Sequence, residues 1–265
     1  ALPLSNGRLG VMVYGGSGRE ELQLNEETIW AGGPHNNVSS EALAALPEVR
    51  RLIFGGKYDE AFELCDEKFS LHASHGMSYQ TAGSLLLDFP GHQACSEFYR
   101  DLNLETAVAT VRYVVDGVRY EREVFTSFPD QVAVVRLTAS ERRRVSFRIS
   151  FATPMDNYRV TASGDNRLLI DGRTDGHETI PGMVRYRTVA EVLPEGGKAV
   201  ADSVGITVTD ADAVTILVSV ATNFNDYRDI SGDPAERAES YLSGARKKRY
   251  SRLKADHIAA YRPWI

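Results

Sequence analysis

The stretch that decides the fold is Leu2 to Pro34, which reads LPLSNGRLGVMVYGGSGREELQLNEETIWAGGP. Leu9 to Tyr14 is apolar on both alternating faces, which predicts a strand that is covered on both sides. The glycines at positions 15, 16 and 18 supply a turn, and Glu20 to Asn25 then alternates between polar and apolar side chains. Together these features predict a β-hairpin near the start of the chain.

Size, composition and charge limit what this chain does. The 265 residues are 43% hydrophobic and 25% charged, which is enough for a sizeable core, and a large all-β sandwich can reach this length as one unit. The formal net charge of −6 argues against a nucleic-acid partner. Two cysteines, Cys65 and Cys95, are too few for a disulfide framework, although the sequence allows a single disulfide between them. The sequence contains no apolar run of about 18 residues, so it predicts no membrane-spanning helix.

Helical and strand patterns divide the rest of the chain. From about residue 40 to 70, apolar side chains recur at intervals of three and four, which predicts a helical insertion that begins after Ser39 or Ser40. Beyond residue 82 strand signals dominate, and Asp116-Gly117 is the strongest hairpin signal. More than ten strands without alternating helices predict antiparallel sheets packed face to face. The strands predicted there are Ser84–Phe89, Thr106–Val115, Val118–Ser127, Gln131–Thr138, Val145–Ala152, Tyr158–Ala162, Arg167–Asp171, Met183–Leu193, Gly205–Thr209 and Ala213–Ala221.

The composition changes again near residue 231. Asp233 to Glu236 is typical of a capping box with proline at the first helical position. Two helical stretches follow, separated near Lys247 to Tyr250, and the chain ends on Trp264 and Ile265. We therefore expect a β-sandwich domain over residues 1–230 and a helical linker over residues 231–265 that leads to a second, missing domain.

Four long stretches of the sequence carry a resemblance to a known family. They are LPLSNGRLG (residues 2–10), QLNEETIWAGGP (23–34), YRDLNLETA (99–107) and YEREVFTSFPDQV (120–132). In this order they resemble the N-terminal domain of family-95 glycoside hydrolases, the α-L-fucosidases, and the similarity runs from residue 2 to about residue 262. One departure is Ser5, where the family usually has glycine, and we expect it to change a turn and not the fold.

The resemblance implies a mainly all-β fold, a large antiparallel β-sandwich (supersandwich) joined by a helical linker to an (α/α)6 catalytic barrel. It also implies an enzyme that hydrolyses terminal fucosyl linkages with inversion, in which one carboxyl protonates the leaving oxygen and a second group activates water. The family's catalytic residues lie in the barrel, so none is assigned to this chain. We expect the chain alone to be the inactive N-terminal domain of such an enzyme. An α-L-galactoside is the alternative substrate, because the two sugars differ only at C6.

Five residues are the candidates for the rim of the substrate pocket or for the interface with the barrel: Asn25, Glu26, Trp30, His35 and Asn36. An aromatic face covers the C–H groups of a sugar, while amide and carboxylate groups bind its hydroxyls. Alternatively, Trp30 fills the joint between sandwich and barrel, and Asn25 and Glu26 satisfy turn backbone. Six carboxylates lie in predicted loops: Glu26, Glu27, Asp156, Asp175, Glu178 and Asp226. Nothing in the sequence indicates that any two of them form an acid–base pair.

No cofactor and no metal site is predicted. His72 and His75 have H-x-x-H spacing and His92 lies nearby in sequence, but no acidic or thiol ligand joins them at a persuasive spacing. The basic runs 142–144 and 246–249 are interpreted as solvated surface, and no phosphate-binding or serine-hydrolase motif occurs. The expected partners are the chain's own catalytic barrel and, in the intact enzyme, a fucosylated glycan, with no nucleic acid and no membrane span.

Two other classes of protein stay open. A free-standing carbohydrate-binding module would expose aromatic side chains on one sheet face or at one loop end. A purely structural sandwich would have Trp30 and Trp264 buried, either by the chain itself or by a neighbouring molecule. The abrupt start at Ala1 further leads us to expect a secreted or periplasmic enzyme whose export signal is not part of this sequence.

Overall fold

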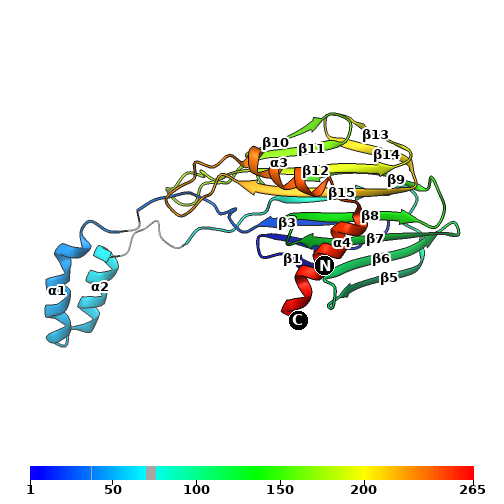
Figure 1. Ribbon diagram of the computed structural model, residues 1–265. Helices are drawn as coiled ribbons and strands as arrows, with labels where there is room; N and C mark the ends of the chain where they lie inside the picture. Colours follow the sequence, from blue (N-terminus) through cyan, green and yellow to red (C-terminus); the bar gives the residue numbers. More distant parts are fainter. Residues whose placement is uncertain (37, 70–75) are drawn as a thin grey trace.

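Two antiparallel sheets face each other in the computed structural model, which describes residues 1–36, 38–69 and 76–265 (Figure 1). In spatial order the seven-stranded sheet contains β1 (Leu2–Ser5), β2 (Leu9–Val13), β3 (Arg19–Glu26), β4 (Gly83–Asp88), β9 (Val145–Ala152), β14 (Gly205–Ala211) and β13 (Lys198–Ala201). The eight-stranded sheet contains β10 (Tyr158–Ser163), β11 (Arg167–Arg173), β12 (Arg185–Glu195), β15 (Ala213–Thr222), β8 (Val132–Ala139), β7 (Val118–Ser127), β6 (Val108–Val115) and β5 (Ser96–Asn103). The predicted antiparallel β-sandwich is therefore confirmed.

The main hydrophobic core lies between the two sheets. Along β2, Leu9, Val11 and Val13 are buried because alternate side chains of a strand point to the same face. Met12, on the other face, is only half-buried, and Tyr14 lies outside the strand and is 46% exposed. The prediction that this strand is covered on both sides is therefore wrong.

Helices cover the outer face of the eight-stranded sheet (Figure 1). α3 (Pro234–Ala245) begins at Asp233, whose carboxylate accepts hydrogen bonds from the backbone N–H of Ala235 and Glu236, as the capping signal predicts. α4 (Tyr250–Tyr261) follows after a short break, and a 3-10 turn, η1 (Arg262–Trp264), ends the chain. A second core of buried apolar side chains joins these helices to the sheet: Val108, Phe125, Val132, Val134, Val189, Leu217, Ala221, Ala238, Leu242, Ala245 and Leu253. The stretch predicted as a linker therefore packs on the sandwich, and all ten residues of β15 are buried beneath it and against the other sheet.

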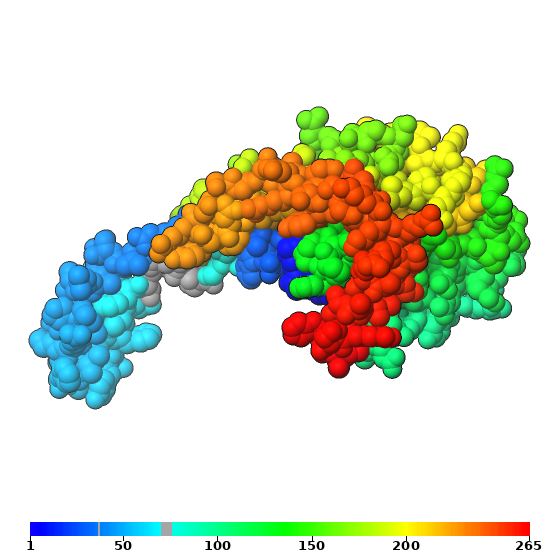
Figure 2. All heavy atoms as spheres, in the orientation of Figure 1, coloured from blue at the N-terminus to red at the C-terminus, as the bar shows by residue number. Residues whose placement is uncertain are grey.

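The helical insertion forms a hairpin that stands away from the sandwich (Figures 1 and 2). α1 (Ala42–Phe54) and α2 (Tyr58–Phe69) lie within the predicted range, and Gly55-Gly56 separates them. The N-cap of α1 is Glu41 without a side-chain cap bond, so neither predicted serine caps it. Leu43 and Phe62 belong to the predicted apolar faces, yet their side chains are 81% and 73% exposed.

An ion pair is buried inside the sandwich. Arg122 on β7 and Glu20 on β3 lie 2.6 Å apart, between Nη2 and Oε2, with side chains that are 2% and 0% exposed. The other oxygen of Glu20 accepts a hydrogen bond from the Gly15 N–H, and Arg122 donates to the Gly16 carbonyl. The guanidinium also lies 5.3 Å from the ring centre of Phe89. The pair thus holds the β2–β3 turn against the opposite sheet.

The sequence signals differ in how well they fit the structure. Asp116 and Gly117 both have positive φ, 50° and 79°, so the predicted type I′ hairpin between β6 and β7 is confirmed. Cys65 and Cys95 are free thiols. Within the described part of the chain, no helix is long and apolar enough to cross a bilayer.

The two basic runs are ion-paired more than the sequence predicts. In the first, Arg142 contacts Asp212 at 3.0 Å and is 88% exposed. In the second, Lys248 contacts the buried Asp130 at 2.6 Å and Asp256 at 2.9 Å. The interpretation as solvated surface is therefore right for Arg142 and wrong for Lys248.

His257 on α4 couples stability to pH. Its ring stacks on Phe125 at 4.7 Å, and Nε2 donates to the Thr106 carbonyl at 2.9 Å. Burial lowers the pKa of His257 below its usual value of 6.5, because the interior disfavours the charged form more than the carbonyls favour it. Below pH 6.5 the unfolded chain therefore binds more protons than the folded chain, and stability falls as pH falls.

We expect the free energy of unfolding to fall between pH 7.5 and pH 5.5, and to fall less in a His257→Gln variant. Urea titrations at both pH values measure the two differences. His92, whose pKa burial also lowers, is present in both proteins, so the comparison isolates His257. An equal fall in the two proteins would contradict the assignment.

Candidate functional site

Two glycines, Gly32 and Gly33, allow the loop after β3 to pack closely against the segment around Asp175 and Met183. The Gly32 N–H donates to the Asp175 carbonyl at 2.9 Å, and the Gly32 carbonyl accepts from Met183 N–H at 2.8 Å. Gly32 has φ of +71°, and a Cβ on Gly33 would lie 2.6 Å from the Met183 side chain. Only glycine fits this conformation and this close approach without strain. The Gly32-Gly33 pair therefore fixes the loop that presents Trp30.

Trp30 is held with one part of its ring open to solvent. Its indole N–H donates to the Glu27 carbonyl at 2.8 Å, and the Tyr79 ring meets it edge-on with centroids 5.1 Å apart. Tyr79 is itself fixed, because its hydroxyl donates to the Glu26 carbonyl at 3.0 Å. Trp30 nevertheless remains 45% exposed. A rigid, half-exposed aromatic surface of this kind suits contact with another apolar face.

A hollow of about 670 Å³ opens beside Trp30 at this end of the sandwich, and we call it the Trp30 hollow. Its size lies in the range of small-ligand sites. Its walls come from the loop after β3, from residue 77, from the start of β12 and from the loop after β15. The lining residues are Glu27, Thr28, Trp30, Ala31, Gly33, Pro34, His35, Met77, Val184, Phe224, Tyr227 and Ile230.

The structure brings together two of the five predicted site residues, Trp30 and His35. The His35 ring is exposed and its Nδ1 lies 2.7 Å from the Gly33 carbonyl, to which it donates. Asn36 is exposed and its side chain accepts from the Val38 N–H, so it forms a turn next to the hollow but does not line it. Asn25 lies on β3, half-buried opposite Gly10.

Glu26 points into the protein and not into the hollow. Its carboxylate is buried and accepts hydrogen bonds from the Thr28 N–H at 2.8 Å and the Thr28 hydroxyl at 2.6 Å. Burial raises the pKa of Glu26, an effect that these hydrogen bonds and Arg8, 3.5 Å away, oppose. The Glu26 side chain thus shapes the turn that carries Trp30.

The Asn-Gly-Arg stretch near the start of the chain is a junction beneath this site. Asn6 Oδ1 accepts from the backbone N–H of Arg8 and so fixes the β1–β2 turn. Arg8 donates to the side chain and carbonyl of Gln131 and to the Val220 carbonyl, at 2.6–2.9 Å. Its guanidinium also lies 4.4 Å from the ring centre of Tyr241 on α3. One arginine therefore ties both sheets and a covering helix together.

Sequence reasoning missed the far wall of the hollow. Phe224, Tyr227 and Ile230 follow β15 in a loop that Asn225 and Asp226 fold back on itself. The signal that could have found this wall is the run Asn-Phe-Asn-Asp-Tyr at residues 223–227, which combines aromatic and amide side chains as the Trp30 loop does.

The site offers binding groups rather than an acid–base pair. Glu27 is the one carboxylate among the lining residues, and Asp175 is held by Gln80 and Asn157 behind the loop. A separate hollow of about 290 Å³ beside α4 contains Asp101 and Glu123, but Glu123 accepts hydrogen bonds from Tyr250 and Lys254.

The histidines do not form a metal centre in the described residues. His92 is packed among Phe89, Tyr113 and Tyr120, and its Nδ1 lies 3.0 Å from the Tyr113 hydroxyl. Outside positions 37 and 70–75, no group of three or more His, Cys, Asp or Glu side chains could hold an ion. The H-x-x-H pair, His72 and His75, lies outside the described residues.

A family model described as "Glycosyl hydrolase family 65, N-terminal domain" matches residues 1–227. The chain belongs to this family. Membership agrees with the predicted N-terminal domain of a glycoside hydrolase, but it names family 65 and does not confirm family 95.

Named relatives of this N-terminal domain include three fucosidases. Alpha-L-fucosidase 2 of Arabidopsis thaliana is 32% identical over 98% of the chain and 34% of its own length. Two proteins named "Probable alpha-fucosidase A", from Aspergillus oryzae and Aspergillus niger, are 26% and 28% identical, over 98% of the chain and 38% and 34% of their own lengths. The chain thus spans about a third of the relatives that it matches.

A solved structure supports the fold of the N-terminal domain. A putative kojibiose phosphorylase from the human microbiome superposes on 98% of the chain with a TM-score of 0.55 and 8% identity, covering 35% of that protein. At this identity the likeness concerns the architecture alone.

Proposed function

We propose that this chain is the non-catalytic N-terminal domain of a glycoside hydrolase that resembles family-95 α-L-fucosidases. The intact enzyme would remove terminal fucosyl groups from glycans with inversion, and it would be secreted or periplasmic. The observation that carries the proposal is the alignment of 98% of the chain with a third of the α-L-fucosidase of Arabidopsis thaliana, at 32% identity. The family model, which is one of an N-terminal domain, supports it.

In this proposal the catalytic barrel is the partner of the chain, and the Trp30 hollow lies at the rim of its substrate pocket. Two features support a partner on this end of the molecule. The Trp30 hollow combines exposed aromatic rings with an apolar wall, and the α1–α2 hairpin exposes large apolar side chains such as Phe54, at 89%, and Phe62. Exposed apolar surface of this extent is typical of interaction sites.

Activity of the isolated chain tests the proposal. With an aryl α-L-fucoside as substrate, the purified 265-residue chain is expected to show no turnover above a buffer control, since its hollow offers a single carboxylate. Turnover that co-purifies with the chain and disappears in a Glu27→Gln variant would contradict the non-catalytic role. An aryl α-L-galactoside assayed in parallel covers the alternative substrate.

The second candidate function is carbohydrate binding by the chain itself, which the half-exposed Trp30 favours. Trp264→Phe leaves Trp30 as the single tryptophan, so its fluorescence reports on the hollow directly. Fucosylated oligosaccharides are expected to shift this emission saturably, and Trp30→Ala is expected to weaken binding about tenfold, or about 1.4 kcal/mol.

The matched control for this prediction is Trp264→Phe itself, because Trp264 is 83% exposed at the other end of the chain. This variant should bind as the unmodified chain does in a calorimetric titration. Equal affinity of the Trp30→Ala variant would contradict binding at the hollow. The purely structural alternative expects both tryptophans to be buried by the chain or by a neighbouring molecule, and the exposures of 45% and 83% show that the chain itself does not bury them.

A further inference from the structure

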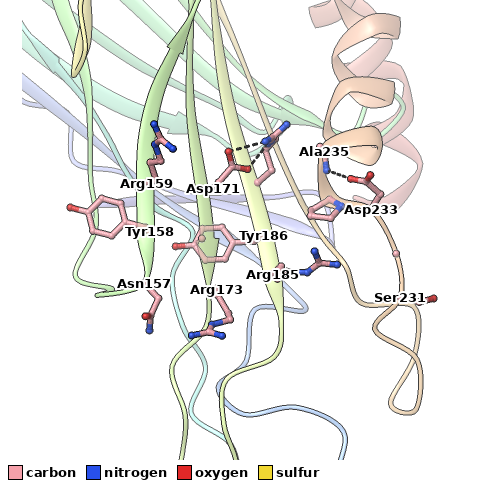
Figure 3. Close-up of a pocket in the computed structure, with 14 residues that line it drawn as sticks. Asn157, Tyr158, Arg159, Asp171, Arg173, Arg185, Tyr186, Ser231, Asp233 and Ala235 are labelled. Carbon is pink, nitrogen blue, oxygen red and sulfur yellow. Dashed lines mark hydrogen bonds and ion pairs between the residues drawn. The ribbon is translucent and has the colours of Figure 1, made fainter.

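A second hollow lies on the eight-stranded sheet, next to the start of α3 (Figure 3). Its volume is about 710 Å³, and its floor is made by β10, β11 and β12. We call it the arginine hollow. Its lining residues are Asn157, Tyr158, Arg159, Asp171, Gly172, Arg173, Arg185, Tyr186, Arg187, Ser231, Gly232, Asp233, Pro234 and Ala235.

The two carboxylates of the arginine hollow are already engaged. Asp171 binds Arg187 through two hydrogen bonds of 2.6 and 2.8 Å, which Figure 3 shows as dashed lines. Asp233 accepts from the backbone N–H of Ala235 at 2.8 Å as the cap of α3. The N–H groups that cap the helix, with Arg187 and Arg185 nearby, lower the pKa of Asp233, so it stays ionised and occupied.

Among the residues that the structure describes, the other three arginines of the hollow have no direct ion-pair partner, although Arg185 lies close enough to the Asp233 carboxylate to lower its pKa. Arg173 on β11 lies directly opposite Arg185 on β12 in the strand register. Arg159 on β10 lies opposite Asp171 on β11, but the Asp171 carboxylate is already ion-paired with Arg187. Within residues 1–36, 38–69 and 76–265, the guanidinium groups of these three arginines make no hydrogen bond or ion pair. Like charges directly opposite each other destabilise a sheet. In Figure 3 the side chains of Arg173 and Arg185 extend in different directions, as repulsion favours.

Several other strand arginines of this chain contact an acidic side chain. Arg112 pairs with Glu121, Arg136 with Glu195 and Arg148 with Asp202. The arginine hollow thus holds an excess of positive charge, four arginines against two carboxylates, on a chain whose net charge is −6. This excess is local, and it lies over a concave surface of a size that takes a sugar unit or two.

We propose that the arginine hollow binds an acidic saccharide, one that bears a carboxylate or a sulfate group, with Arg173 and Arg185 on the anion. A guanidinium presents paired N–H donors that match the oxygens of a carboxylate or sulfate. Tyr158, 43% exposed on the edge strand, offers a ring face to the sugar, and Asn157 and Ser231 offer polar groups to its hydroxyls. The anion follows from the arginines, whereas the saccharide as its carrier rests on the proposed function.

Calorimetric titration of the 265-residue chain tests this inference. The probes are a trigalacturonate, a sulfated disaccharide, a neutral oligosaccharide of matched length and inorganic sulfate. An acidic saccharide is expected to bind at least tenfold more tightly than the neutral one, and its affinity is expected to fall as NaCl rises from 20 to 200 mM. The relative affinities of the first two probes identify whether carboxylate or sulfate is preferred.

Variants separate this site from the rest of the molecule. Arg173→Ala and Arg185→Ala are each expected to weaken acidic-saccharide binding about tenfold, and the lysine variants less, because lysine keeps the charge but loses the paired donors. Arg50→Ala removes an exposed arginine from α1 and is the matched control, with no expected change. Neither hollow variant should lose stability in urea, because each removes repulsion; a clear loss would mark a structural role and overturn the inference.

Three results would overturn the proposal. They are equal binding of neutral and acidic saccharides, equal binding of inorganic sulfate and the acidic saccharide, and unchanged affinity in both arginine→alanine variants. Because Trp30 lies outside the arginine hollow, the Trp30→Ala variant should bind acidic saccharides normally. Failure of the arginine hollow therefore leaves the test of the fucosidase proposal intact, and the reverse also holds.

Discussion

Replacing Arg122 by alanine is expected to lower the free energy of unfolding by about 3–5 kcal/mol, because it leaves the buried carboxylate of Glu20 without its partner. The side chains of both residues are at most 2% exposed, so water cannot replace the missing charge. The change also removes a hydrogen bond to the Gly16 carbonyl and the contact with Phe89. Urea unfolding at pH 7 measures the loss.

A double variant shows whether the loss comes from the unpaired charge. Glu20→Leu combined with Arg122→Met replaces the ion pair by apolar side chains, which is often neutral or better for a buried pair. We expect the double variant to regain most of the stability that Arg122→Ala loses, and to fold even where the single variant does not. A loss below 1 kcal/mol in the single variant, or a double variant less stable than it, would contradict this account.

Leu242→Ala is expected to destabilise the chain by about 2–5 kcal/mol, the range found for truncating a fully buried leucine. Leu242 is 0% exposed, and it packs with Phe125, Val134 and Leu217 beneath α3. The prediction separates a helix that is part of the fold from a connecting segment that only rests on it. In the second case the truncation would change the free energy of unfolding by less than 0.5 kcal/mol.

Leu43→Ala is the matched control, because this leucine lies in α1 and is 81% exposed. The same chemical change is expected to alter stability by no more than about 0.5 kcal/mol there. Leu242 and Leu43 both lie in helices, so the two variants differ only in how deeply the leucine side chain is buried. A similar loss in both variants would mean that α1 packs against the rest of the chain in solution.

The strands could be predicted from the sequence where side-chain alternation follows burial. Val145–Ala152 is found at its predicted bounds because one face of that strand is buried and the other is not. β5 (Ser96–Asn103) and β13 (Lys198–Ala201) were missed, and both are edge strands with mostly exposed side chains. An edge strand that does not bury one face carries no period-two signal, so its place depends on the neighbouring strand.

The candidate site could be predicted only in part. The glycine pair and Trp30 identified the loop, because a large aromatic between such residues is unusual for a mobile surface segment. Tyr227 could not be linked to Trp30 from sequence, since their separation along the chain is bridged only by the order of strands in the two sheets. The two partners of Glu26 differ in this respect, because Thr28 is local in sequence whereas Arg8 reaches Glu26 only through the pairing of β2 with β3.

The position of β15 has a consequence for biosynthesis. A ribosome makes a chain from its N-terminus, yet this strand, the last to be translated, lies between β12 and β8 in the middle of its sheet. Until residues 213–222 emerge, the β5–β8 ribbon and the β10–β12 ribbon have no common neighbour and each leaves an edge unpaired. Completion of this sheet must therefore wait until residues 213–222 have been made, and a nascent chain stalled before this point would expose strand edges that can pair with other strands.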